Sequence, residues 1–154
     1  METESPFTHI LVPTDGSETS INAGRLAIRI AATHGIPITF VYVVDSAVVY
    51  EVAETTSETA EMVHRDLETK GRRYLNYLTR MAHEMNLEAD QVILSGLPHT
   101  EIANLARERG IDLIVIGQVG RRGPRRVLIG SVAERVIEYA PCPVLVVRQV
   151  PSRR

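Results

Sequence analysis

Aromatic residues are scarce in this chain: Phe and Tyr together make up 5% of 154 residues, and tryptophan is absent. The interior must therefore be packed mainly from Val, Ile, Leu and Ala. Cysteine occurs once, which excludes an intrachain disulfide framework. No stretch reaches the roughly 18 apolar residues that span a bilayer. The N-terminal segment METESPFTHI also lacks the basic and apolar regions of a secretory signal. We therefore expect a cytoplasmic protein without a membrane partner.

Charge of one sign is not in excess either. The chain has 17 basic and 19 acidic residues, for a formal net charge of -2. A surface of this kind does not favour nucleic acid as a partner, although local clusters of charge can still do so. With 154 residues, of which 44% are apolar, the chain fits a single domain over 1–154.

Apolar runs alternate along the chain with segments of helical periodicity. The runs at 9–14, 37–44, 89–96, 111–117 and 141–150 predict five strands. The periodic segments predict helices at 21–35, 58–86, 98–110 and 131–140, whereas 45–57 looks like a loop. Ser131 followed by Glu134 is typical of a capping box that opens the last helix. This order predicts an α/β fold: an open five-stranded parallel sheet with helices on both faces.

Ligands of open parallel sheets bind beyond the carboxyl ends of the strands. Three stretches are expected to meet there: PTDGS after the first strand, VVD at the end of the second, and GQVGRRGPRRVLIGS after the fourth. The third stretch holds four glycines and four arginines. Glycines allow backbone amides to approach a ligand closely, because they have no Cβ.

The end of this Gly-rich stretch predicts an anion site. Gly130 and Ser131 come directly before a predicted helix, whose free amides and positive dipole end attract phosphate. Arginines provide the fork geometry that suits phosphate oxygens. The stretch lacks the Walker A pattern, and no dinucleotide fingerprint follows the first strand. The residues therefore favour a phosphate-bearing ligand such as a nucleotide, with an ordinary flexible basic connection as the alternative.

Signals of catalysis or metal binding are weak. The five histidines are scattered, so we expect surface or strand-end roles for them and no metal site: His9, His34, His64, His83 and His99. No Ser–His–Asp or Cys–His arrangement can be assembled from adjacent strand ends. Neither a general base for a γ-phosphate nor a carboxylate cluster for two metals is evident. Binding therefore looks primary, any ATP hydrolysis should be slow, and whether the protein is an enzyme stays open.

The glycine spacing resembles a known family. Gly117 is followed by two residues and Gly120, then by nine residues and the pair Gly130-Ser131. This spacing, together with ILVPTDGSETS near the start and PCPVLVV near the end, resembles the ATP-binding subgroup of the universal stress proteins. The likeness covers a core of about 7–148. It implies a Rossmann-like fold of the adenine nucleotide alpha hydrolase type, and a regulatory protein of the stress response that binds ATP or another adenine nucleotide.

The resemblance also implies a ligand pose. Asp15, with Pro13 and Thr14, would meet the adenosine end, and the backbone of Val43 would meet adenine. The phosphates would lie against backbone amides and the Ser131 hydroxyl, with Mg²⁺ riding on them. Together with the arginines expected from their charge, the predicted nucleotide-binding residues are Pro13, Thr14, Asp15, Val43, Ile116, Gly117, Gly120, Arg121, Arg122, Gly130, Ser131 and Val132. The resemblance further implies a homodimer in which the fifth strands, about 143–149, meet across a two-fold axis.

Some positions depart from the family pattern. Gln118 and Val119 stand where many relatives have Ser and His, and Ala133 stands where some have Thr. Fewer side-chain donors then face a triphosphate, so either the arginines compensate or a different adenine nucleotide is preferred. Two further functions stay open: a slow ATPase or nucleotide-handling enzyme, and an interaction module whose arginine loop binds acidic partners. Asp15 could also be only a turn residue, and Ser131 only a helix cap.

Overall fold

The computed structural model describes residues 4–119 and 129–148. The strands are β1 (Ile10–Pro13), β2 (Ile38–Asp45), β3 (Ala89–Gly96), β4 (Leu113–Gly117) and β5 (Val144–Val147). The helices are α1 (Glu18–His34), α2 (Ser46–Thr55), α3 (Ala60–Glu84), α4 (Pro98–Glu108) and α5 (Ser131–Tyr139). All strand pairs are parallel, and the order across the sheet is β3-β2-β1-β4-β5. The predicted open five-stranded parallel α/β sheet is confirmed.

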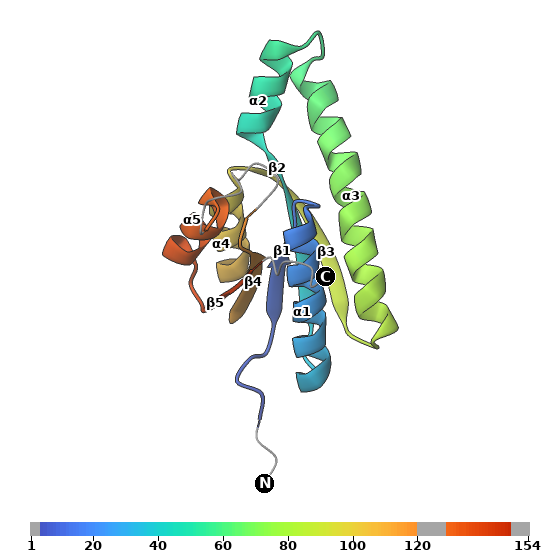
Figure 1. Ribbon diagram of the computed structural model, residues 1–154, viewed down its shortest axis with the longest axis vertical. Coiled ribbons are helices and arrows are strands. Elements are labelled where there is room, and N and C mark those ends of the chain that lie inside the picture. Colours follow the sequence, from blue (N-terminus) through green and yellow to red (C-terminus); the bar gives the residue numbers. More distant parts are fainter. Residues whose placement is uncertain (1–3, 120–128, 149–154) are drawn as a thin grey trace, which may run out of the picture.

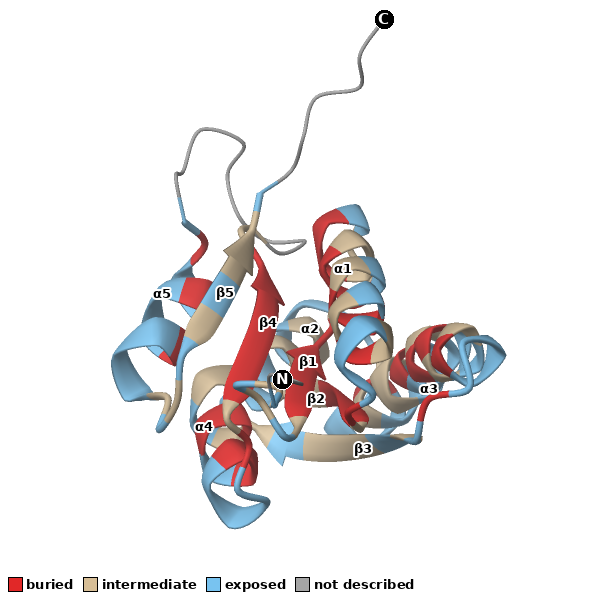
Figure 2. Ribbon diagram, turned by 90° about the horizontal axis from the view of Figure 1, so that it is seen from below, coloured by how far each residue is buried: buried red, intermediate tan, exposed pale blue. Residues whose placement is uncertain are grey.

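Helices cover both faces of the sheet. Helices α1 and α3 pack on one face, and α4 and α5 on the other (Figure 1; Figure 2). Side chains alternate between two cores along each central strand, because successive residues of a strand point to opposite faces. In β1, for example, Ile10 and Val12 join the core under α1 and α3, while Leu11 joins the core under α4. The central strands therefore read as continuous apolar runs, and β4 is buried along its whole length.

The prediction of a loop at 45–57 is wrong, since Ser46–Thr55 forms α2. The Asp45 side chain caps this helix by accepting a hydrogen bond of 3.0 Å from the Ala47 amide. Val49 is the single buried residue of α2. A short helix with one buried position gives a weak periodic signal, and its β-branched residues Val48 and Val52 count against a helix. Helices α2 and α3 form a hairpin that extends beyond the sheet (Figure 1).

Two helix beginnings also differ from prediction. Helix α1 begins at Glu18, three residues before the expected start, because Ser17 caps it by accepting from the Ser20 amide (3.2 Å). The predicted capping box of α5 does not form. Gly130 is the N-cap, with extended backbone angles, and Ser131 is the first helical residue. The Ser131 hydroxyl is therefore one position too late to cap the helix.

Close helix–sheet contacts require glycine at one position of α3. A Cβ atom on Gly71 would lie 2.2 Å from the ring of Tyr42 on β2. This contact sets how closely α3 approaches the sheet. None of the helices in residues 4–119 and 129–148 combines the length with the apolar character that crossing a membrane requires.

Candidate functional site

A cavity of about 700 Å³ opens at the carboxyl ends of β1, β2 and β4. The chain builds β1, β2 and β3 outward on one side of the sheet and then crosses to β4 on the other side of β1. The carboxyl ends of β1 and β4 therefore form the topological switch point, where such sheets bind ligands.

Every predicted site residue within the described part of the chain lines this cavity. These residues are Pro13, Thr14, Asp15, Val43, Ile116, Gly117, Gly130, Ser131 and Val132. The other three predicted residues, Gly120, Arg121 and Arg122, lie outside the described residues. Elements far apart in the sequence thus meet at one hollow, as the parallel topology requires.

The turn after β1 forms one wall of the cavity. Thr14 is only 5% exposed, and its hydroxyl lies 2.9 Å from the Ser20 hydroxyl on α1. The Asp15 carboxylate accepts a hydrogen bond of 2.9 Å from the Ser17 amide. Asp15 therefore does serve the turn, and it lines the cavity as well.

Gly16, in the same turn, must be glycine for two reasons. Its φ of +80° lies in the left-handed region, and a Cβ atom would fall 2.2 Å from the ring of Tyr74. Tyr74 belongs to α3, so the aromatic ring fixes the turn from outside the cavity. The turn that carries Asp15 is thereby held between α1 and α3.

The amino end of α5 forms another part of the wall. Gly130 is buried, and Ser131 and Val132 are the first two helical residues. The first amides of a helix have no partner within it, so they carry a partial positive charge toward the cavity. The Ser131 hydroxyl makes no hydrogen bond to another described residue. This wall can therefore offer several neutral donors to an anion.

Gly117, at the end of β4, has a packing role that the glycine spacing did not reveal. A Cβ atom there would lie 3.0 Å from both the Cγ2 and the backbone carbonyl carbon of Thr19 on α1. Such distances are tighter than most real Cβ contacts, so β4 and α1 approach each other closely here. This close contact favours glycine at 117 independently of any ligand.

The remaining walls are largely apolar. Val41, Val43 and Ile116 come from the strands, and Ile102 comes from α4. Sequence reasoning missed Val48 of α2, Leu67 of α3, and Pro98 and Ile102 of α4, all of which line the cavity. Pro98 lies two residues after the end of β3. Its position just beyond the carboxyl end of a predicted strand was the signal that could have identified it. Val48 gave no signal, because it lies in the helix that was taken for a loop.

Charge in the cavity comes from two acidic side chains and one helix end. Asp15 and Asp45 both line it, and no described lining residue is Lys, Arg or His. The described carboxylates and histidine with displaced pKa values lie elsewhere, near the amino ends of the strands: His9, Asp90 and Asp112. The described walls thus combine apolar surface and two carboxylates with the neutral amide and hydroxyl donors of the α5 end, and it is beside this helix end that an anion is suited.

Comparisons with known proteins agree with this architecture. The model of the universal stress protein family matches residues 6–148. Universal stress protein MJ0531 of Methanocaldococcus jannaschii is 38% identical over 146 residues, which cover 95% of this chain and 85% of that protein. The solved structure of MJ0577, from the same organism, superposes with a TM-score of 0.82 at 27% identity and covers 95% of this chain and 99% of its own.

A structure of lower identity contains a nucleotide. The universal stress protein of Archaeoglobus fulgidus in complex with dAMP has a TM-score of 0.64 and 22% identity, covering 92% of this chain and 98% of its own. At this identity the likeness establishes a shared fold. The binding of dAMP is an observation on the Archaeoglobus protein.

Proposed function

Because this chain belongs to the universal stress protein family, we propose that its cavity binds an adenine nucleotide and that binding regulates the protein's part in a stress response. One observation carries the proposal: the turn after β1 and the first turn of α5 line the same cavity. The bound dAMP of the Archaeoglobus relative supports the same ligand class.

The chemistry of the walls assigns an orientation to the nucleotide. The adenine ring lies against the half-buried apolar side chains of Val43, Val48 and Leu67, where a flat base buries surface favourably. The backbone of Val43 offers hydrogen-bonding groups to the ring edge. The Asp15 carboxylate accepts from ribose hydroxyls, because an ionised carboxylate only accepts hydrogen bonds.

The phosphates lie at the amino end of α5. The amides of Ser131 and Val132 and the Ser131 hydroxyl donate to phosphate oxygens, and Gly130 leaves room for them. ATP is the proposed nucleotide, with Gly120, Arg121 and Arg122 reaching its outer phosphates and Mg²⁺ bound to the phosphates themselves. Any hydrolysis is proposed to be slow and secondary to binding.

Binding is proposed to act through a homodimer. Strand β5 is an edge of the sheet, and Leu145 is 38% exposed on it. Ile137 and Tyr139 of the neighbouring α5 are 45% and 51% exposed. An apolar edge strand invites pairing with a second copy. Light scattering during gel filtration should give twice the monomer mass for the natural chain, and a Leu145→Arg variant should elute as a monomer.

Isothermal titration with ATP, ADP, AMP and GTP tests the nucleotide proposal directly. Adenine nucleotides should bind, and GTP should bind more weakly because its base edge differs. Mass spectrometry after gentle purification should also detect a retained adenine nucleotide. Binding of none of the adenine nucleotides by folded protein would refute the proposal. Binding of nucleic acid that weakens steeply with salt would instead favour the interaction-module alternative.

A further inference from the structure

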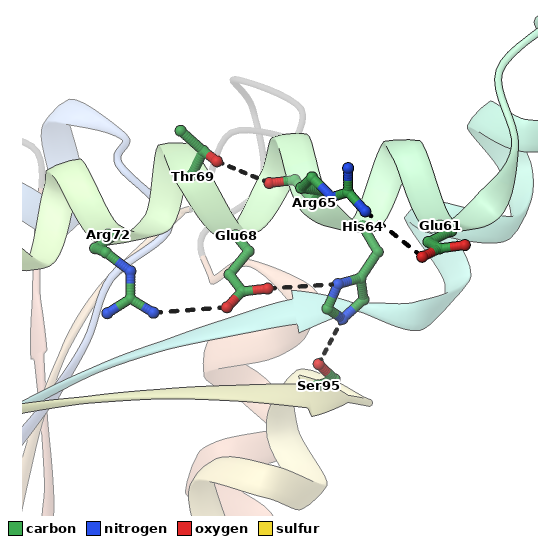
Figure 3. Close-up of polar contacts among 7 residues, drawn as sticks. All are labelled: Glu61, His64, Arg65, Glu68, Thr69, Arg72 and Ser95. Atoms are coloured by element: carbon green, nitrogen blue, oxygen red, sulfur yellow. Dashed lines mark hydrogen bonds and ion pairs between the residues drawn. The ribbon is translucent and has the colours of Figure 1, made fainter.

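A serine, a histidine and a glutamate form a chain of contacts on the outer side of β3. The Ser95 hydroxyl oxygen lies 2.8 Å from Nε2 of His64, and Nδ1 of His64 lies 3.7 Å from Oε2 of Glu68 (Figure 3). We refer to these residues as the Ser95 triad. They come from β3 and from successive turns of α3, which explains why the sequence did not bring them together.

The connectivity of these contacts is that of an activated nucleophile. A hydroxyl contacts one ring nitrogen of a histidine, and a carboxylate lies beside the other ring nitrogen. When the proton is on Nδ1, the facing carboxylate stabilises that tautomer, and Nε2 is free to accept the hydroxyl proton. A distance of 3.7 Å is longer than a hydrogen bond, as catalytic contacts often are in the absence of substrate.

Arg72 holds the carboxylate from the next turn of α3. Its Nη2 lies 3.5 Å from Oε1 of Glu68, the oxygen that does not face His64 (Figure 3). One Glu68 oxygen is thus directed to the arginine and the other to the histidine. Glu68 and Arg72 are positioning residues, since neither contacts the Ser95 hydroxyl.

The Ser95 triad borders a cleft of about 430 Å³ that also includes Gln91, Ile93 and Leu94. This volume suits a small organic ligand. The cleft shares no lining residue with the cavity proposed for the nucleotide. It is therefore a separate site on the chain.

The backbone of β3 adds a donor beside the Ser95 hydroxyl. Strand β3 is an edge of the sheet, and its backbone groups alternate between β2 and the open side. The carbonyl of Glu88 accepts from Ile38 of β2, whereas the carbonyl of Ala89 faces His83 of α3, 3.3 Å from its Nε2. Ser95 is six residues after Ala89, so its own amide points to the open side, where it can stabilise an oxyanion.

We propose that the Ser95 triad is a second, catalytic site that hydrolyses small carboxylic esters. The Ser95 oxygen bonds to the ester carbonyl carbon, and its proton moves to Nε2 of His64. The tetrahedral intermediate then breaks its bond to the alcohol oxygen, and that oxygen takes the proton from His64 as the alcohol leaves. Water attacks the acyl-Ser95 by the same route, releasing the carboxylic acid and restoring the hydroxyl.

The expected acceleration is modest. His64 and Glu68 are 39% and 41% exposed, so water screens the charges that develop. General base catalysis contributes about 10²- to 10⁴-fold, and we expect the lower end, about 100-fold relative to Ser95→Ala.

A fluorophosphonate probe and 4-nitrophenyl acetate test this proposal with the nucleotide-free protein. The probe should label Ser95, as located by peptide mass spectrometry, and His64→Gln should slow the labelling about 100-fold. The rate of ester turnover should also fall about 100-fold in Ser95→Ala. In Glu68→Gln, kcat should fall while KM stays unchanged, because Glu68 orients the base without contacting the ester. Thr69→Ala is the matched control. The Thr69 hydroxyl donates to the backbone carbonyl oxygen of Arg65 on the same helix and lies outside the triad (Figure 3).

Three results would overturn the proposal. These are labelling spread evenly over exposed hydroxyls, labelling of Ser95 that is unchanged in His64→Gln, and ester turnover that persists in Ser95→Ala. Circular dichroism of each variant confirms that it is folded. Titration of the same variants with nucleotide distinguishes this proposal from the nucleotide proposal. If the Ser95 triad is not catalytic, the binding of adenine nucleotides is unaffected.

Discussion

The backbone amide of Gly130 donates a hydrogen bond of 2.7 Å to the carbonyl oxygen of Gln118. This bond joins the residue that follows β4 directly to the N-cap of α5. The amino end of α5 is therefore placed by the sheet itself. The amides proposed to bind phosphate are in position before any ligand arrives, which reduces the entropy cost of binding.

Gly130→Val should weaken nucleotide binding while preserving the fold. The backbone angles of Gly130, φ -68° and ψ 158°, are accessible to valine, so the change adds no backbone strain. The added side chain would fill space beside the phosphate-binding amides. Loss of one or two hydrogen bonds to a charged group costs about 2–3 kcal/mol, or roughly 30- to 150-fold in affinity. Calorimetry with ATP measures the affinity, and Glu138→Val on the exposed side of α5 is the control. Unchanged affinity in Gly130→Val would place the phosphates elsewhere.

Replacing Arg121 and Arg122 together by alanine should weaken ATP more than AMP. The two residues lie outside the described part of the chain, so this prediction depends on the sequence and the proposed pose alone. Arginine contacts to β- and γ-phosphates are lost for ATP, whereas AMP has neither phosphate. The measurement is the ratio of the two dissociation constants in the natural chain and in the variant. An equal loss for both nucleotides would move these side chains away from the outer phosphates.

The sheet and most of the cavity could be predicted because buried parallel strands and their ligand sites follow simple rules. Continuous apolar runs indicated buried parallel strands, and ligand sites of such sheets lie at their carboxyl ends. Helix α2 could not be predicted in this way, since its single buried residue, Val49, leaves almost no periodic signal. The Ser95 triad was missed because a side-chain contact between positions 64 and 95 depends on how α3 crosses β3.

The glycine spacing reflects helix–sheet packing as well as the proposed ligand site. Gly117 matched the family pattern and was expected to accommodate the ligand, and the structure shows that it also accommodates Thr19. A single glycine can therefore satisfy both a packing constraint and a ligand-binding constraint, and sequence spacing does not separate the two. Mutation with two readouts, stability and affinity, can.

Gly117→Ala should destabilise the fold whether or not nucleotide is present. The new Cβ would lie 3.0 Å from Cγ2 of Thr19, which is only 5% exposed and cannot move into solvent. Overpacking of this kind costs about 1–3 kcal/mol. Thermal unfolding without ligand measures the loss. The double variant with Thr19→Ser should recover part of it, because serine lacks Cγ2, but the backbone carbon of residue 19 stays close. An unchanged melting temperature in Gly117→Ala would show that α1 yields at this contact.

His9→Gln should reduce the dependence of stability on pH just below about 6.5, the pKa of an unfolded histidine. Burial lowers the pKa of His9 below its ordinary value, and the nearby Arg109 lowers it further, although Asp90, Asp112 and Glu88 oppose the change. The Thr39 hydroxyl donates to Asp90, so the neutral His9 ring donates from Nε2 to the Thr39 oxygen at 2.7 Å. This network joins the amino ends of β1, β2 and β3.

The sign of the effect follows from proton binding in the two states. An unfolded histidine titrates near pH 6.5, and folded His9 titrates lower, so the unfolded chain binds more protons between the two values. Stability from His9 is therefore complete above about pH 6.5 and decreases as the pH falls toward the folded pKa. Urea unfolding at several pH values should give a flatter curve for His9→Gln than for the natural chain. Asp90 and Asp112 have lowered pKa values, so their contributions are lost only as the pH falls below about 4, outside this window. Parallel curves for the two proteins would show that His9 has the same proton affinity folded and unfolded.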